Sequence, residues 1–117
     1  FFALTGKVTS LDPATMTPQQ VLRSATRAGA LSQGREDCGL VKEGFKADLI
    51  VVDKSGPNWT ASDDIANGLI YSADGKDVCL TMCDGMTLYR DREYTFLDVE
   101  KINAEAVKAK AEILKRL

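Results

Sequence analysis

The chain has 117 residues, of which 44% are hydrophobic and 27% are charged, and its net charge is −2. This length suits one small domain or a piece of a larger one. The charge balance argues against a nucleic-acid partner, and no apolar run approaches the roughly 18 residues of a membrane-spanning helix, so we expect a soluble, cytoplasmic protein.

Cysteine and histidine usage limits the chemistry further. Three cysteines, Cys38, Cys79 and Cys83, are an odd count that fits a reducing compartment better than a disulfide framework. Four residues apart on a strand, Cys79 and Cys83 would lie about 13 Å from one another, too far for one tetrahedral zinc ion. The sequence contains no histidine, which excludes a Ser/His or Cys/His nucleophile. We predict no catalytic, cofactor-binding or metal-binding residue.

Residues 1–11 are apolar and loosely periodic, and we expect the end of a helix running towards Gly6. Asp12-Pro13 predicts a turn.

A second helix is predicted from Thr17 to Gly34. Thr17 is expected as its N-cap, Pro18 takes the first helical position and Gln20 completes a capping box. Gly34 is expected to end the helix. One apolar face is marked by Val21, Leu22, Ala25, Ala28 and Ala30.

The periodicity then changes to that of extended structure. Segments 38–41 and 43–45 are predicted as short extended pieces separated by glycine turns. Residues 47–53 form a compact apolar run bounded by carboxylates, which predicts a buried strand. Asp48 is expected to hydrogen-bond local backbone without taking part in chemistry.

The following stretch mixes loop and hairpin signals. Residues 54–67 are predicted as a polar surface loop in which Trp59 covers a patch of core. Residues 68–71 fit a short helix or a strand equally well. Residues 78–83 and 86–89 predict two strands joined by an Asp84-Gly85 hairpin turn, and 93–97 is a further candidate strand.

Asp98 is expected to cap a final amphipathic helix that packs on its own parent domain. These elements do not form a closed sheet, so at least one strand should have an unpaired edge. We therefore predict an α+β fragment. The apolar stripe of the final helix comprises Val99, Ile102, Ala106, Ala109, Ile113 and Leu117.

The order of these elements resembles the C-terminal end of the metal-dependent amidohydrolase superfamily. The subgroup it resembles holds triazine hydrolases and the cytosine, guanine and methylthioadenosine/S-adenosylhomocysteine deaminases. The resemblance spans nearly the whole chain. It is carried by Ala25-Thr26-x-x-Gly29-Ala30, by Gly39-Leu40-Val41-x-x-Gly44-Phe45-Lys46-Ala47-Asp48-Leu49, by Ile70-Tyr71-Ser72-Ala73-x-Gly75-x-x-Val78 and by Asp84-Gly85.

The resemblance implies an architecture in two parts: a TIM barrel of roughly 250 residues that carries the chemistry, and a composite β-sandwich built from both chain ends. This chain would supply helices from the end of the barrel domain (1–36), a segment of the composite sandwich (37–97) and a C-terminal amphipathic helix (98–117). Because the sequence starts at Phe1 rather than Met, we expect an excised or processed piece.

The resemblance also implies a divalent metal, zinc or iron, in the full-length parent. That ion activates a water molecule for hydrolytic deamination of a purine, pyrimidine or triazine-like ring. In the family, a His-x-His pair, further histidines and an aspartate of the last barrel strand hold the metal; that strand would lie just before Phe1. We therefore expect a non-catalytic scaffold portion, inactive alone, whose partner is the missing barrel portion or a second copy of itself.

Two other functions stay open. The first is a free-standing, non-catalytic module that dimerises through its open sheet edges. The second is a small-molecule or metal-binding domain that uses Cys38, Cys79, Cys83 and the aspartates, although no ligand spacing supports this.

Overall fold

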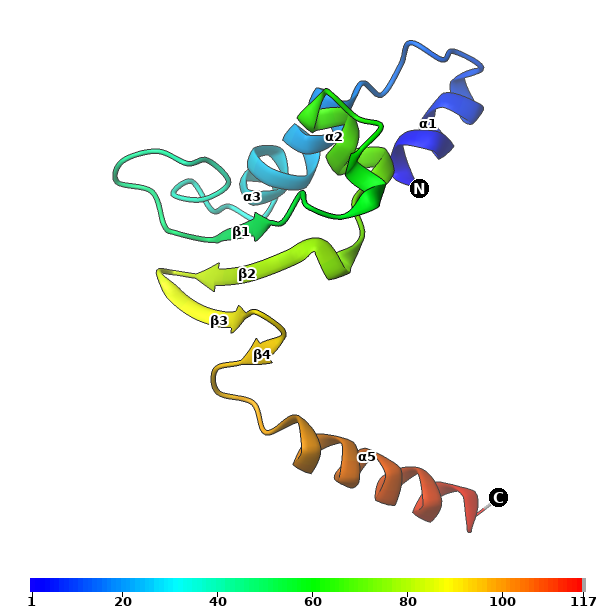
Figure 1. Cartoon of the computed structure of the whole chain (residues 1–117), viewed down its shortest axis with the longest axis vertical. Helices are drawn as coiled ribbons and strands as arrows, with labels where there is room; N and C mark the ends of the chain where they lie inside the picture. Colours follow the sequence, from blue (N-terminus) through cyan, green and yellow to red (C-terminus); the bar gives the residue numbers. More distant parts are fainter. Residues whose placement is uncertain (117) are drawn as a thin grey trace.

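The computed structural model describes residues 1–116. Helices gather at one end of the molecule, a four-stranded sheet forms the middle, and a long helix stands off at the other end (Figure 1). The Cα radius of gyration is 18.6 Å, whereas a compact domain of this length has about 13 Å. The chain is thus a mixed helix and sheet structure with the shape of an open bracket.

The first helix, α1 (Phe2–Ser10), continues through Gly6 instead of ending there. Leu11 ends it in the left-handed conformation, with φ of 51°. The predicted turn follows, and the Asp12 carboxylate accepts a hydrogen bond from the backbone N–H of Ala14 at 2.8 Å.

The second helical segment comprises α2 (Pro18–Arg23), the π-helix η1 (Ser24–Ala28) and α3 (Gly29–Ser32). The predicted capping box is confirmed: Thr17 Oγ1 accepts from the Gln20 N–H, and Gln20 Oε1 accepts from the Thr17 N–H. The predicted end at Gly34 is also confirmed, because Gly34 has φ of 72° and the N–H of Arg35 donates back to the Ala30 carbonyl.

The segment between this helix and the sheet forms turns and bends, and the short extended pieces predicted at 38–41 and 43–45 do not pair as strands. Gly39 explains why the chain turns here: its φ is +81°, and a Cβ on it would lie 2.8 Å from both Thr26 O and Arg27 Cα. Glycine therefore allows the loop to press directly on the π-helix backbone.

The sheet is antiparallel with strand order β1-β2-β3-β4. Its strands are β1 (Leu49–Val52), β2 (Val78–Cys83), β3 (Met86–Arg90) and β4 (Glu93–Tyr94). The Asp84-Gly85 hairpin is confirmed, since both residues have positive φ, 48° and 80°. The strand expected over 93–97 is only two residues long.

The prediction that β1 is buried was wrong. Ile50 is 57% exposed and Val51 is 46% exposed. Strand β1 pairs with β2 alone, and the described residues leave much of its surface open. Composition identified the strand, but burial depends on what packs against it.

Residues 54–67 were predicted as a loop, but the segment 54–77 contains four short helices. They are the 3-10 helix η2 (Pro57–Trp59), the short helix α4 (Ile65–Asn67), the π-helix η3 (Gly68–Ser72) and the 3-10 helix η4 (Gly75–Asp77). The undecided segment 68–71 is therefore helical.

The last helix, α5 (Val99–Leu114), has the predicted cap, because Asp98 Oδ1 accepts from the Lys101 N–H at 2.9 Å. It projects away from the rest of the chain (Figure 1), and its residues are exposed. Leu117, the last position of the predicted stripe, lies outside the described residues. Among residues 1–116, no helix is long and apolar enough to cross a membrane.

Candidate functional site

A cavity lies between the second helical segment and the sheet. Its volume is about 630 Å³. Small residues of the helices, such as Ala25 and Gly29, form one wall, and Leu49 and Met82 of the strands contribute to the other. Arg35 and Asp48 add the charge to this otherwise largely apolar lining.

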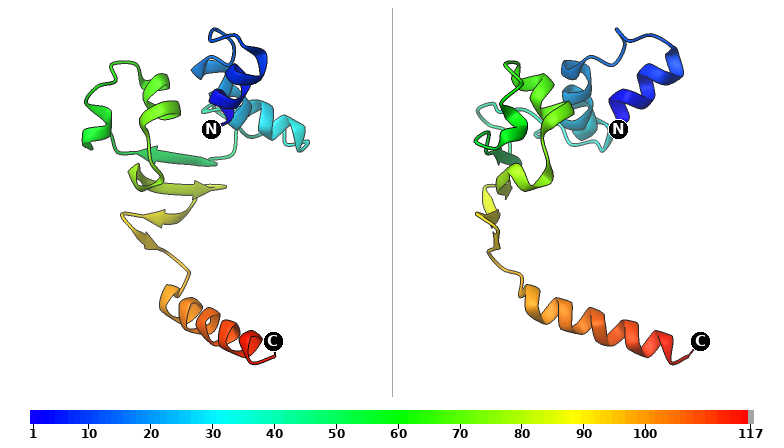
Figure 2. Two further views of the ribbon diagram at one scale, coloured as in Figure 1. Left: turned by 90° about the vertical axis from the view of Figure 1, so that its right-hand side faces the viewer. Right: turned by 45° about the vertical axis from the view of Figure 1, so that its right-hand side comes forward.

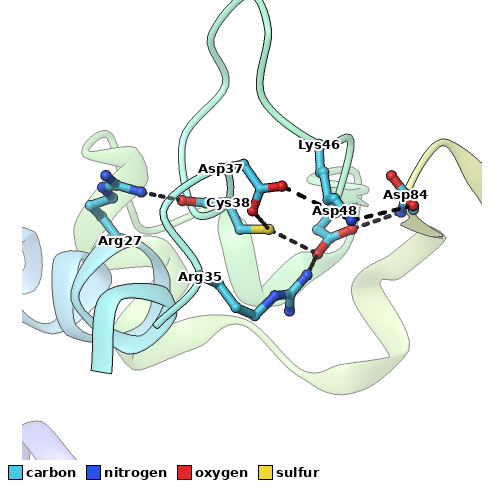
Figure 3. A network of polar contacts seen from close by, with 7 residues as sticks. All are labelled: Arg27, Arg35, Asp37, Cys38, Lys46, Asp48 and Asp84. Atoms are coloured by element: carbon cyan, nitrogen blue, oxygen red, sulfur yellow. Dashed lines mark hydrogen bonds and ion pairs between the residues drawn. The ribbon is translucent and has the colours of Figure 1, made fainter. Parts of the chain in front are cut away.

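A polar network borders this cavity and centres on Asp48, which immediately precedes β1 (Figure 3). Asp48 Oδ1 accepts a hydrogen bond from the backbone N–H of Asp84 at 2.7 Å. Asp48 Oδ2 forms an ion pair with Arg35, whose place is set by the helix end at Gly34. One carboxylate thus joins the helix end, β1 and the β2–β3 hairpin.

These contacts stabilise the charged form of Asp48. Its pKa is lowered from 3.8 to about 2, first by the N–H of Asp84 and then by the Arg35 side chain. Asp48 is therefore a carboxylate throughout the neutral range, and its oxygens are occupied by protein donors. Such a group is a poor general acid or base near pH 7.

Two further residues extend the network. Lys46 Nζ lies 3.5 Å from Asp84 Oδ2 and 4.0 Å from Asp37 Oδ2, and its pKa is raised, chiefly by the charge of Asp84. Arg27 Nη1 donates to the backbone carbonyls of Glu36 and Cys38, each at 2.8 Å. Arg27 therefore holds the loop against the helices, and Lys46 joins the loop to the hairpin.

Cys38 is the buried cysteine of the network, with 2% exposure. Its Sγ lies 3.4 Å from Asp37 Oδ1 and 3.6 Å from Asp48 Oδ2. Burial, followed by the hydrogen bond to Asp37, raises the pKa of this thiol. A reactive cysteine needs a lowered pKa, so Cys38 is placed as a small packing residue.

The structure does not gather the three cysteines. Cys79 lies on β2 with its Sγ 3.5 Å from the Val51 carbonyl, and Cys83 is exposed at the end of the same strand. Over the described residues, no three His, Cys, Asp or Glu side chains form a group that could hold a metal ion. The residues present therefore do not fit a zinc site.

A second polar cluster was not foreseen and centres on Asp77. Its Oδ2 accepts from Asn58 Nδ2 at 2.8 Å, from Trp59 Nε1 at 3.0 Å and from the Asp74 N–H at 2.9 Å. The Asp74 N–H is the largest cause of the lowered pKa of Asp77. The spacing Asp74-x-x-Asp77 resembles a capping box, and this pattern in the sequence could have indicated the cluster.

Trp59 is packed deeply within this cluster, with 4% exposure. A Cβ on Gly68 would lie 2.5 Å from Trp59 Cζ3, so glycine at 68 is required for the ring to lie against the helix. Both polar clusters therefore join segments that lie apart in the sequence.

Comparison with known proteins agrees with this geometry. The amidohydrolase family matches residues 2–88. The 5′-deoxyadenosine deaminase of Methanosarcina mazei is 40% identical over 115 residues, which are 98% of this chain and 26% of that protein. The 5-methylthioadenosine/S-adenosylhomocysteine deaminase of Pelotomaculum thermopropionicum is 39% identical over 114 residues, 97% of this chain and 26% of that protein.

Solved structures give the same result. A zinc-bound adenosine deaminase from Xanthomonas campestris superposes with a TM-score of 0.92 at 27% identity, covering 97% of this chain and 26% of that chain. The atrazine chlorohydrolase of Arthrobacter aurescens TC1, complexed with zinc, superposes with a TM-score of 0.72 at 29% identity, covering 79% and 20%. The chain spans about a quarter of the length of the curated relatives it matches.

Proposed function

Because this chain belongs to the amidohydrolase family, we propose that it is the non-catalytic C-terminal scaffold of a zinc-dependent deaminase. One observation carries the proposal: the chain matches a quarter of the length of full deaminases along 98% of its own length, yet it contains no histidine. Its own residues hold together helices, loop and sheet. The zinc ion would be held by residues supplied by the rest of the parent.

Within this proposal the chain has three parts. Residues 1–36 are helices from the end of the barrel domain, 37–97 are a segment of the composite β-sandwich, and 98–117 are the C-terminal helix. The half-exposed strand β1 supports this division, because a strand so rich in Leu, Ile and Val needs a covering layer. The parent would act on a purine, pyrimidine or triazine-like ring; its relatives are named for substrates with a purine or a triazine ring.

A chimera tests the scaffold role. In it, residues 1–117 replace the matched quarter of the M. mazei 5′-deoxyadenosine deaminase. We expect the zinc-loaded chimera to release ammonia from 5′-deoxyadenosine, since the relative supplies the metal ligands and this chain supplies the supporting structure. The relative without its matched quarter is the control and should be inactive.

The isolated chain provides the opposite test. With zinc and 5′-deoxyadenosine it should release no ammonia, because it lacks the imidazoles of a catalytic zinc site. Turnover by the isolated chain would refute the scaffold role, as would a folded but inactive chimera.

The sheet edges favour a second candidate function, a self-associating module. Within the described residues, β1 and β4 are the outer strands, and unpaired edges are templates for strand pairing. Light scattering on the isolated chain and on the chimera distinguishes the scaffold from the self-associating module. A dimer of the isolated chain at low micromolar concentration that is also found for the chimera would favour the module.

A further inference from the structure

The helix α5 presents an apolar face that nothing in the described chain covers. Its polar face carries charges spaced three or four residues apart: Lys101, Glu105, Lys108, Glu112 and Lys115. A separate face carries an apolar stripe of Val99, Ile102, Ala106, Ala109 and Ile113.

Exposed apolar residues also occur in the chain just before α5. Tyr94 of β4 is half-exposed, and Phe96 and Leu97 of the connecting segment are exposed as well. Exposed apolar residues therefore follow one another along the chain from the sheet edge, through the connection and into α5. An isolated helix of about 15 residues is marginal in water, so α5 needs a surface to pack against.

The position of α5 is shared with a solved enzyme. The superposition on the X. campestris adenosine deaminase covers 97% of this chain with a TM-score of 0.92, which leaves too few residues outside it to omit the 16 residues of α5. The X. campestris enzyme therefore has an equivalent helix at the same position, although the rest of the matched segment does not pack against it. Three-quarters of that enzyme lies outside the match.

The bracket shape indicates which body fills this space. The N-terminal helices and α5 project on the same side of the sheet in Figure 1 and in the right-hand view of Figure 2. A single globular body seated against that side would contact both ends. A second copy is itself an open bracket and offers no such compact body.

We propose that α5 is a clasp that docks its apolar face, in the same polypeptide, on the outside of the remaining part of the parent enzyme. This inference rests on the proposed function, since it needs that remaining part. The N-terminal helices would contact that remaining part at one end of the bracket, and α5 would contact it at the other.

Hydrogen exchange in the chimera tests the clasp. The amides of 99–114 should exchange at least about tenfold more slowly in the chimera than in the isolated chain, because docking suppresses local opening. The double variant Ile102→Asn/Ile113→Asn should lose that protection. The matched control Lys101→Asn/Lys108→Asn makes the same kind of change on the charged face and should retain it within about twofold.

The outcomes separate the two proposals. An active chimera whose α5 exchanges as fast as in the isolated chain overturns the clasp and leaves the scaffold role intact. Protection that increases with protein concentration, together with a dimer in light scattering, also overturns it, because a second copy would then cover α5. A folded but inactive chimera refutes the scaffold role, whatever the exchange of α5.

Discussion

The carboxylate of Asp48 joins segments that lie far apart in the sequence. One oxygen accepts from Asp84, 36 residues away, and the other pairs with Arg35, 13 residues away. The prediction that Asp48 hydrogen-bonds local backbone was wrong, because the backbone N–H that it accepts from belongs to the hairpin. Only the fold brings hairpin and strand start together, so spacing alone could not identify the partner.

The two partners of Asp48 make separable contributions to its pKa. Replacing Arg35 by Met should raise the pKa of Asp48 from about 2 but leave it below the ordinary value, because the Asp84 N–H has the larger effect. Carboxyl ¹³C chemical shifts of the chain, followed against pH, measure this. Lys76→Met removes a cation from an exposed pair with Asp74 and should leave the Asp48 titration unchanged.

The sign of the pH dependence follows from the same shift. Folding lowers the pKa of Asp48, so its contribution to the free energy of unfolding is complete above the unfolded-state value of about 3.9. That contribution declines as the pH falls towards the folded-state value of about 2.

Gly39 carries the close contact between loop and helix. Gly39→Ala should lower the free energy of unfolding by about 1–3 kcal/mol, the range for a strained backbone position, because φ is +81° and the new Cβ would lie 2.8 Å from helix backbone. Urea denaturation of the chimera measures this. Gly75→Ala, where a Cβ meets nothing within 4 Å, should change stability by less than about 0.5 kcal/mol.

At the scale of elements, local chemistry was predictable and tertiary environment was not. The capping box at Thr17, the Asp98 cap and the Asp84-Gly85 turn depend on neighbouring residues, and each is confirmed. The exposure of β1 depends on layers supplied by other segments, so the apolar composition of the strand led to the wrong prediction that it is buried. The π-helix at 24–28 also escaped prediction, since its sequence fits an ordinary α-helix and its widened turn lies where the Gly39 loop packs.

The segment from η2 to η4 should loosen if Asp77 is removed. Asp77→Ala takes away the acceptor shared by Asn58 and Trp59, so the buried indole should gain access to water. Trp59 is the sole tryptophan of the chain, and its emission should shift to longer wavelength with stronger acrylamide quenching. Asp63→Ala, at an exposed position of the same segment, should alter neither; equal spectra for both variants would contradict the assigned role of Asp77.

At the scale of the whole molecule, the bracket exposes more apolar surface than an independent domain usually does. The residues buried among 1–116 are few, with Ala3, Val21, Cys38 and Trp59 as the apolar ones. Large exposed side chains extend from Phe2 in the first helix to Leu114 in the last. So many large exposed apolar residues indicate an interface, which agrees with a chain that covers about a quarter of its relatives.

Dye binding should report this exposed surface directly. We expect the isolated chain to enhance the fluorescence of 8-anilinonaphthalene-1-sulfonate strongly at neutral pH, because its apolar faces are open to the dye. In the chimera the same residues should be covered, and the enhancement per molecule should fall to that of the intact M. mazei deaminase. Ile102→Asn/Ile113→Asn should restore part of the signal in the chimera if α5 is thereby released. An isolated chain that binds no dye and sediments as a compact monomer would contradict both the open bracket and the need for a covering body.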